Sequence, residues 1–95
     1  MLNTYESMVV FSPNFSEVDV KKENEKIHTF LKNNGGEIVK TEELGKKRLA
    51  YEINKFAEGY YFVNYYKFAK DKVTELENYF KLNENIIRFN ILIKE

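Results

Sequence analysis

The sequence has no cysteine, no excess of one charge and no long apolar run. Without cysteine the chain has no disulfide, thiolate metal site or thiol nucleophile. Fifteen cations balance fifteen carboxylates, so the protein has little overall attraction for nucleic acid, and such binding would need a local cluster or a basic partner. The longest apolar runs, such as residues 8–11, are too short to cross a membrane, and no signal peptide is evident. We therefore expect a cytoplasmic protein.

The composition is sufficient for one hydrophobic core. Of 95 residues, 43% are apolar and 16% are aromatic, mostly Phe and Tyr. A chain of this length buries roughly two-thirds of the surface that it exposes when unfolded. No repeat, linker or low-complexity segment divides it, so we predict a single domain over residues 1–95.

A strand and a helix are predicted first. Residues 5–11 are β-branched and aromatic on both faces, which is typical of a central strand. Ser16 and Asp19 have the spacing of a helix-capping pair, and an apolar stripe at helical spacing follows them. Gly35 and Gly36 end this helix because glycine adopts the left-handed conformation without a clash.

A strand pair follows. Residues 38–53 form the second predicted strand, and Gly45 inside it indicates a bulge. A turn over residues 54–59 then leads into a third strand over residues 60–68, whose bulky side chains on both faces again indicate a central position. The alternation at the end of the second strand predicts a buried face that includes Leu49, Tyr51 and Ile53.

The last third of the chain predicts a helix and a strand. Val73, Leu76 and Phe80 lie at helical spacing within residues 71–81, although the residues before them offer no capping acceptor. Apolar and polar residues then alternate over residues 87–94.

This order of elements is β-α-β-β-α-β. Two right-handed crossovers predict an α+β, ferredoxin-like sandwich: a four-stranded antiparallel sheet of order 4-1-3-2 with both helices on one face. The other face has no helix to cover it, and its apolar content suggests a binding surface. We expect it to carry Met8, Val10, Tyr61, Val63 and Tyr65, together with Arg88 and Asn90.

Little in the sequence supports an enzyme. His28 is the only histidine and lies on a helix, where a core-edge position is more common than the role of general base. The one glycine pair follows a helix instead of preceding one, so it cannot cradle a phosphate. We therefore expect neither catalysis nor a cofactor.

Aromatic and basic residues gather around the second and third strands. The cations Lys46, Lys47 and Arg48 are adjacent, and although such a triplet is usually only solvated, Tyr51 and Lys55 lie close by. The segment GYYFVNY, residues 59–65, is similar to the first ribonucleoprotein motif of RNA-recognition domains.

The similarity of residues 59–65 to the ribonucleoprotein motif is imperfect. Glu58 stands where the motif has a cation, and Tyr61 stands where it has Gly or Ala. We expect Tyr60 and Phe62 to face the helices rather than to stack on bases. A free-standing RNA-recognition module and a small ligand-binding domain that dimerises through its sheet remain the alternatives.

Residues 45–54, GKKRLAYEIN, resemble the diagnostic motif of the bacterial small-subunit ribosomal protein six family. That motif runs Gly, any, basic, polar, Leu, Ala or Ser, Tyr, any, Ile, and every fixed position matches. The resemblance extends over essentially the whole chain, through Tyr5-Glu6, Pro13-Asn14, Glu42-Glu43-Leu44, Lys55, Gly59-Tyr60, Asn85 and Arg88.

The resemblance implies a structural component of the small ribosomal subunit. Such a protein binds the central domain of 16S rRNA as a heterodimer with small-subunit ribosomal protein eighteen, without a cofactor, a small-molecule substrate or a membrane. The chain has Asn3 and Thr4 where family members often have arginines, which removes the basis for an N-terminal RNA contact. It stops at Glu95 where many members continue, so a smaller partner interface is expected.

The predicted site has two parts. For the partner protein we expect the uncovered sheet face, through Met8, Val10, Tyr61, Val63 and Tyr65. For RNA we expect Lys46, Lys47, Arg48, Lys55 and Arg88, with Tyr5 and Tyr51 as packing residues.

Overall fold

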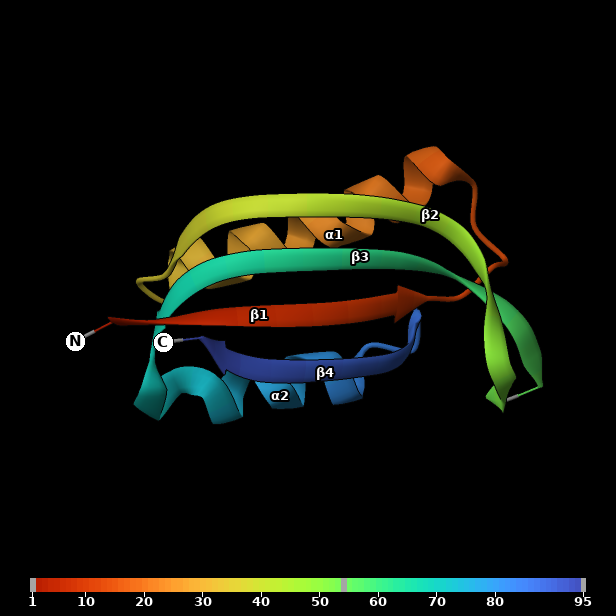
Figure 1. Cartoon of the computed structure of the whole chain (residues 1–95). Helices are drawn as coiled ribbons and strands as arrows, with labels where there is room; N and C mark the ends of the chain where they lie inside the picture. The colour runs from red at the N-terminus through yellow and green to blue at the C-terminus, as the bar shows by residue number, and fades with distance from the viewer. Residues whose placement is uncertain (1, 54, 95) are drawn as a thin grey trace.

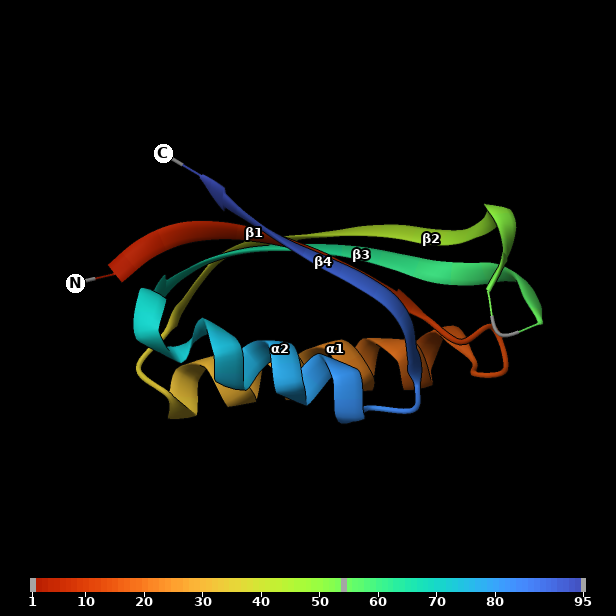
Figure 2. The same ribbon diagram turned by 90° about the horizontal axis from the view of Figure 1, so that it is seen from below.

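The computed structural model describes residues 2–53 and 55–94. Its four strands form one antiparallel sheet in the order β2-β3-β1-β4, and both helices cover the same face (Figures 1 and 2). This confirms the predicted βαββαβ sandwich and its strand order. The elements are β1 (Leu2–Phe11), α1 (Glu17–Asn33), β2 (Glu37–Ile53), β3 (Phe56–Ala69), a 3-10 turn η1 (Lys70–Lys72), α2 (Val73–Leu82) and β4 (Ile86–Lys94).

Both ends of α1 follow from local sequence. The Ser16 hydroxyl accepts a hydrogen bond from the Asp19 N–H at 3.2 Å, which satisfies one of the free donors of the first turn. At the other end Gly35 has a φ of +81°, and the Gly36 N–H donates to the Leu31 carbonyl at 2.7 Å. This is a Schellman ending, in which glycine avoids the Cβ clash of the left-handed conformation.

The β2–β3 hairpin is longer than predicted. Ile53 pairs with Phe56, so β3 begins four residues before the predicted start at residue 60. The predicted wide turn is therefore wrong for residues 56–59, which belong to the strand. Lys55 in the short connection has a φ of +70°, and Asn54 lies outside the described residues.

The core lies between the sheet and the two helices. Tyr60 and Phe62 are buried in it, which confirms that they face the helices and leaves them no open surface on which to stack a base. The rings of Phe11 and Phe62 meet edge to face at 5.5 Å, a favourable arrangement for aromatic pairs. The other buried members are Tyr5, Val9, Val20, Ile27, Leu31, Tyr66, Phe68, Leu76, Phe80 and Ile86.

A buried polar cluster joins α1 to β2 and β3. The side-chain amides of Asn24 and Asn64 exchange two hydrogen bonds of 3.0 and 2.9 Å, and Asn64 is fully buried. Thr41 also donates to Asn64 Oδ1, at 2.9 Å, and His28 Nε2 lies 3.0 Å from the same oxygen. His28 thus occupies a structural position at the edge of the core.

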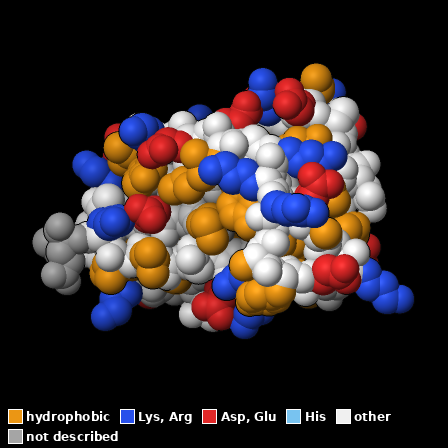
Figure 3. Space-filling view, turned by 45° about the vertical axis from the view of Figure 1, so that its right-hand side comes forward, with side chains coloured by type: hydrophobic (Ala, Val, Ile, Leu, Met, Phe, Trp, Pro, Cys, Tyr) orange, Lys and Arg blue, Asp and Glu red, His pale blue; other side chains and the backbone are white. Residues whose placement is uncertain are grey.

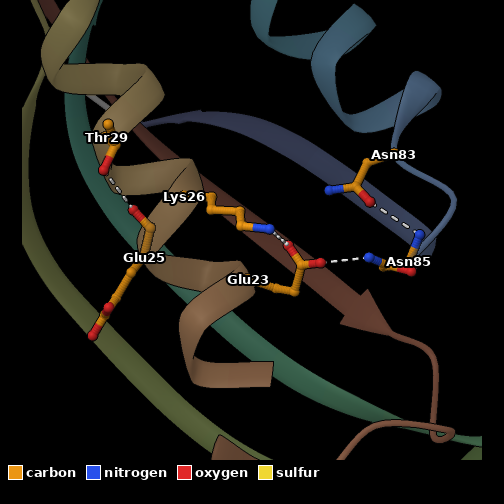
Figure 4. Close-up of polar contacts among 6 residues, drawn as sticks. All are labelled: Glu23, Glu25, Lys26, Thr29, Asn83 and Asn85. Carbon is orange, nitrogen blue, oxygen red and sulfur yellow. Dashed lines mark hydrogen bonds and ion pairs between the residues drawn. The ribbon is translucent and has the colours of Figure 1, made fainter. Parts of the chain in front are cut away.

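The loop before β4 is fastened to α1 by the buried carboxylate of Glu23 (Figure 4). The Asn85 side-chain amide donates to that carboxylate, and Lys26 Nζ lies 3.4 Å from its other oxygen. The Asn83 side chain in turn accepts from the Asn85 N–H at 3.0 Å. These contacts position the start of β4, and with it Arg88.

One buried hydroxyl makes a stability prediction possible. The hydroxyl of fully buried Tyr66 has no hydrogen-bond partner among the described residues, and the Ser7 hydroxyl donates to the Asn90 carbonyl at 3.2 Å. Burial raises the pKa of Tyr66 to about 12, against a smaller opposing effect of Ser7. The phenolate is therefore strongly disfavoured in the folded protein.

We expect Tyr66→Phe to stabilise the protein at pH 7 by about 1 kcal/mol, because it removes an unpaired buried hydroxyl. Ionisation of Tyr66 does not affect stability below the unfolded pKa of about 10, where the phenol is neutral in both states. Between pH 10 and 12 the unfolded chain loses this proton while the folded protein keeps it, so the stability of the wild type falls by about 1.4 kcal/mol per pH unit. Urea unfolding at pH 7 and pH 11 should show a smaller alkaline loss in the variant. Tyr61→Phe is the control, and an unchanged alkaline loss in Tyr66→Phe would contradict the prediction.

Candidate nucleic-acid interface

The face of the sheet away from the helices is formed by alternate residues of the four strands. Val10 of β1 lies opposite Tyr61 of β3 and Arg88 of β4, and because side chains in a strand alternate, this row fixes which residues share the face. Val10 itself is fully buried beneath its neighbours, so it offers no contact area. Four other side chains predicted for this open face, Met8, Tyr61, Val63 and Tyr65, are half-buried.

Charges at one end of the open face are paired within the protein. Lys94 Nζ lies 3.1 Å from the Glu6 carboxylate, and Lys40 Nζ lies 3.6 Å from that of Glu42. The Tyr65 hydroxyl donates to Glu42 Oε1 at 3.0 Å, and this hydrogen bond raises the pKa of Tyr65. This end is therefore a neutralised polar border.

The other end carries the outer part of the β2–β3 hairpin, residues 46–58, which we call the basic arm. It extends beyond the other two strands, and its β2 half rises on the side opposite the helices before the chain returns to β3 (Figure 2). Gly45 at its base has a φ of +81°, and the pairing shifts between Glu43 and Gly45, which confirms the predicted bulge. Within the described residues, no ion pair involves Lys46, Lys47, Arg48, Lys55 or Arg88.

The structure separates the three adjacent cations. Lys47 lies opposite Gly59, on the side of the open face. Lys46 lies opposite Tyr60 and places its Nζ 5.6 Å from the centre of that ring, on the other side. Arg48 shares the side of Lys46, because neighbouring residues of a strand point in opposite directions. The cations therefore line both sides of the arm.

A second irregularity displaces the middle of the arm. Between the pairs Arg48–Glu58 and Ile53–Phe56, residues 49–52 of β2 face only Ala57 of β3. The excess length breaks the alternation on which the predicted buried face depends, and that prediction is wrong for Tyr51, whose side chain is 62% exposed.

Tyr51 instead reaches a cation of another strand. Arg88 Nη1 donates to the Tyr51 hydroxyl at 3.1 Å, and the guanidinium carbon lies 5.7 Å from the centre of the tyrosine ring. The contact brings β4 to the arm, so Arg88 and Lys47 face the same side of the molecule. In Figure 3, Lys and Arg side chains lie among hydrophobic ones over this part of the surface.

Tyr5 does not belong to this surface. Its side chain is 4% exposed and stacks on Tyr66, with ring centres 5.9 Å apart, in the core beneath the sheet. Tyr5 is therefore not part of the RNA-binding surface.

The sequence analysis also missed the close approach of Gly59 to β1. A Cβ on Gly59 would lie 2.4 Å from Val10 Cγ1.

The described parts of the chain contain neither a metal-ligand cluster nor a helix that could span a membrane. Residues 2–53 and 55–94 contain no group of three or more His, Asp or Glu placed to hold a metal ion. None of the helices in these ranges is long and apolar enough to span a bilayer. An uncovered apolar sheet face that borders cations without a carboxylate partner is typical of a binding protein of the α+β sandwich class.

Comparison with known proteins identifies the family. Residues 4–93 match the family described as Ribosomal protein S6. Small ribosomal subunit protein bS6 of Halalkalibacterium halodurans is 45% identical over 87 residues, 92% of each chain, and that of Dictyoglomus turgidum is 38% identical over 94 residues, 99% of this chain and 97% of the relative. The crystal structure of 30S ribosomal protein S6 from Thermotoga maritima superposes with a TM-score of 0.92 at 33% identity, covering 99% of this chain and 89% of that one.

The chain belongs to the ribosomal protein S6 family. This is a family of small-subunit ribosomal proteins and not of enzymes, which confirms the resemblance in residues 45–54 and the predicted location on the ribosome in the cytoplasm.

Proposed function

We propose that this protein binds the central domain of 16S rRNA as a heterodimer with small-subunit ribosomal protein eighteen. RNA meets the basic arm and Arg88, and the partner protein covers the open face through Met8, Tyr61, Val63 and Tyr65. The observation that carries the proposal is the apolar face of the sheet, left bare by both helices and bordered at one end by cations without an intramolecular carboxylate partner. That statement holds for residues 2–53 and 55–94.

The charge balance favours binding together with a partner. Each phosphate neutralised contributes about −0.9 to the slope of log affinity against log salt, so three or four contacts give a slope of only about −3. Such a slope is too shallow for tight binding at physiological salt by this chain alone, whose net charge is zero. A basic partner on the open face would supply the missing contacts.

The two ends of the open face suit different occupants. A protein interface has an apolar centre and a polar border, and the ion pairs Lys94–Glu6 and Lys40–Glu42 form such a border beside the half-buried aromatic and aliphatic side chains. Phosphate recognition needs cations that are not already neutralised. Lys47, Arg48 and Arg88 meet that condition within the described residues.

The decisive variant replaces Lys47, Arg48 and Arg88 together by alanine. Because these side chains are exposed and form no ion pair within the described residues, the free energy of unfolding should change by less than about 1 kcal/mol. Binding to a complex of partner protein and a central-domain RNA fragment should weaken by more than about tenfold, and the salt slope should become shallower by about 2 to 3. Gel-shift titration at two salt concentrations measures both quantities.

A charge-matched control uses three exposed lysines of the helices, on the side of the sheet away from the open face. Changing Lys21, Lys22 and Lys81 to alanine removes the same charge and, among the described residues, only the surface ion pairs Lys21–Glu43 and Lys81–Glu77, which contribute little to stability. This control should bind almost as tightly as the wild type. Equal weakening by both triple variants would show a non-specific effect of net charge, and unchanged binding by the first variant would remove its residues from the interface.

A further inference from the structure

We propose that Tyr51 is a positioning residue that holds the Arg88 guanidinium in place for phosphate binding. The inference rests on the proposed function, because Arg88 must contact RNA for its placement to matter. It differs from the expectation that Tyr51 packs directly on the nucleic acid: here Tyr51 acts through Arg88. The observation behind it is the paired hydrogen bond and ring contact between the two side chains.

The contact links two strands that are not neighbours in the sheet. Tyr51 comes from the end of β2 and Arg88 from β4, whereas β3 and β1 lie between these strands in the order β2-β3-β1-β4. Tyr51 reaches Arg88 because residues 49–52 face a single residue of β3 and the arm curls over the end of the open face (Figures 1 and 2). The extra residues of β2 in the arm thus allow Tyr51 to reach Arg88.

The contact with Tyr51 restrains the Arg88 side chain but leaves most of its N–H donors free. An exposed arginine side chain loses rotamer freedom when it binds a phosphate, and a ring contact and a hydrogen bond that already restrain it make this loss smaller. The bond to the Tyr51 hydroxyl uses Nη1, and a guanidinium has five N–H donors in a planar fork. Donors therefore remain for a bidentate contact with phosphate oxygens.

Contacts with the rest of the protein fix the position of the Arg88 main chain. Its strand begins at the loop that Asn85 fastens to the Glu23 carboxylate, and the Arg88 backbone lies opposite Val10. These contacts fix the main chain of β4 but not the end of a long, exposed side chain. Among the described residues, Tyr51 has the only side chain that accepts a hydrogen bond from the Arg88 guanidinium.

A double-mutant cycle tests the proposal with the full chain, the partner protein and the central-domain RNA fragment. Tyr51→Ala should weaken binding about two- to fivefold, which is the value of one exposed cation–ring contact. Tyr51→Phe keeps the ring and should retain most of the affinity. In an Arg88→Ala background, Tyr51→Ala should have no further effect, because the group that it positions is absent.

The outcomes separate this inference from the proposed function. Weakening by Arg88→Ala with full additivity of the two substitutions would show direct contact of Tyr51 with RNA and overturn the inference while leaving the function intact. Weakening by Arg88→Ala with no effect of Tyr51→Ala would also overturn it. Unchanged binding by Arg88→Ala would remove Arg88 from the RNA interface and so refute both statements for this residue.

A measurement on the free protein gives a second readout. The side-chain N–H signals of Arg88 in NMR spectra should show restricted motion in the wild type and in Tyr51→Phe, and greater motion in Tyr51→Ala. The melting temperature should hardly change, because the contact is exposed. Equal mobility of Arg88 in all three proteins would overturn the proposal.

Discussion

Asn64→Leu is expected to lower the free energy of unfolding by about 3 kcal/mol, one of the two largest effects predicted for this protein. The substitution keeps the branched shape of the side chain but leaves the buried Asn24 amide without the two hydrogen bonds that it makes with Asn64. Each buried polar group without a partner costs about 1–3 kcal/mol. In a domain of this size the melting temperature should fall by roughly 10–25 °C, as calorimetry would measure.

The Asn24–Asn64 pair allows a sharper test than the single substitution. If the cost comes from the unpaired amide, Asn24→Leu combined with Asn64→Leu should cost less than the sum of the two single changes, because no orphaned amide remains. Asn78→Leu, on the exposed side of α2, is the control for placing leucine in the chain and should change stability by less than about 1 kcal/mol. Strict additivity of the two core changes would contradict the explanation.

Gly59→Ala is expected to have an effect of similar size for a steric reason. A Cβ at Gly59 would lie 2.4 Å from Val10 Cγ1 and 3.0 Å from the Phe11 carbonyl oxygen, and Val10 is fully buried and cannot swing away. Overpacking of this kind typically costs 1–3 kcal/mol, so we expect a loss of about 3 kcal/mol in urea unfolding. Lys47, which pairs with Gly59, should move with the arm, and RNA binding should weaken as well.

Two further variants identify the clash as the cause. Val10→Ala removes the methyl groups that the new Cβ would meet first, so Gly59→Ala should cost less in that background than in the wild type. Gly45→Ala is the second control: nothing lies within 4 Å of a Cβ there, and its φ of +81° alone should cost about 1–2 kcal/mol. If Gly59→Ala were as stable as the wild type, the close approach of β3 to β1 would not be a constraint.

Prediction from the sequence succeeded where the deciding interactions are local. The Ser16 cap, the glycine ending of α1 and the bulge at Gly45 each depend on residues within one turn or one strand. The burial of Tyr60 and Phe62 followed from alternation in a regular strand. Prediction failed for Tyr51 because the pairing beyond Arg48 is irregular, and the rule of alternation holds only while the ladder is in register.

The sequence indicated which residues to consider for the site but not the directions in which their side chains point. Adjacency in the chain suggested that Lys47 and Arg48 act together, whereas the strand directs them to opposite sides of the arm. Tyr5 shares the family pattern with Tyr51 but lies in the core, because the odd-numbered residues of β1 face the helices. Composition and motif indicate which side chains are available, while the direction of each depends on register.

The sequence by itself determined the order of the elements, the ends of the first helix, the two faces of the sheet and, through residues 45–54, the family. Tertiary structure alone decided that Tyr51 meets Arg88, that Asn24, His28, Thr41 and Asn64 form one polar cluster, and that Gly59 must lack a side chain. The physical reason is the separation along the sequence of the groups that interact. Caps, turns and alternation arise from interactions between residues that are close in the sequence. The partner of a polar group or the room for a Cβ depends on strands that come together only when the whole sheet has formed.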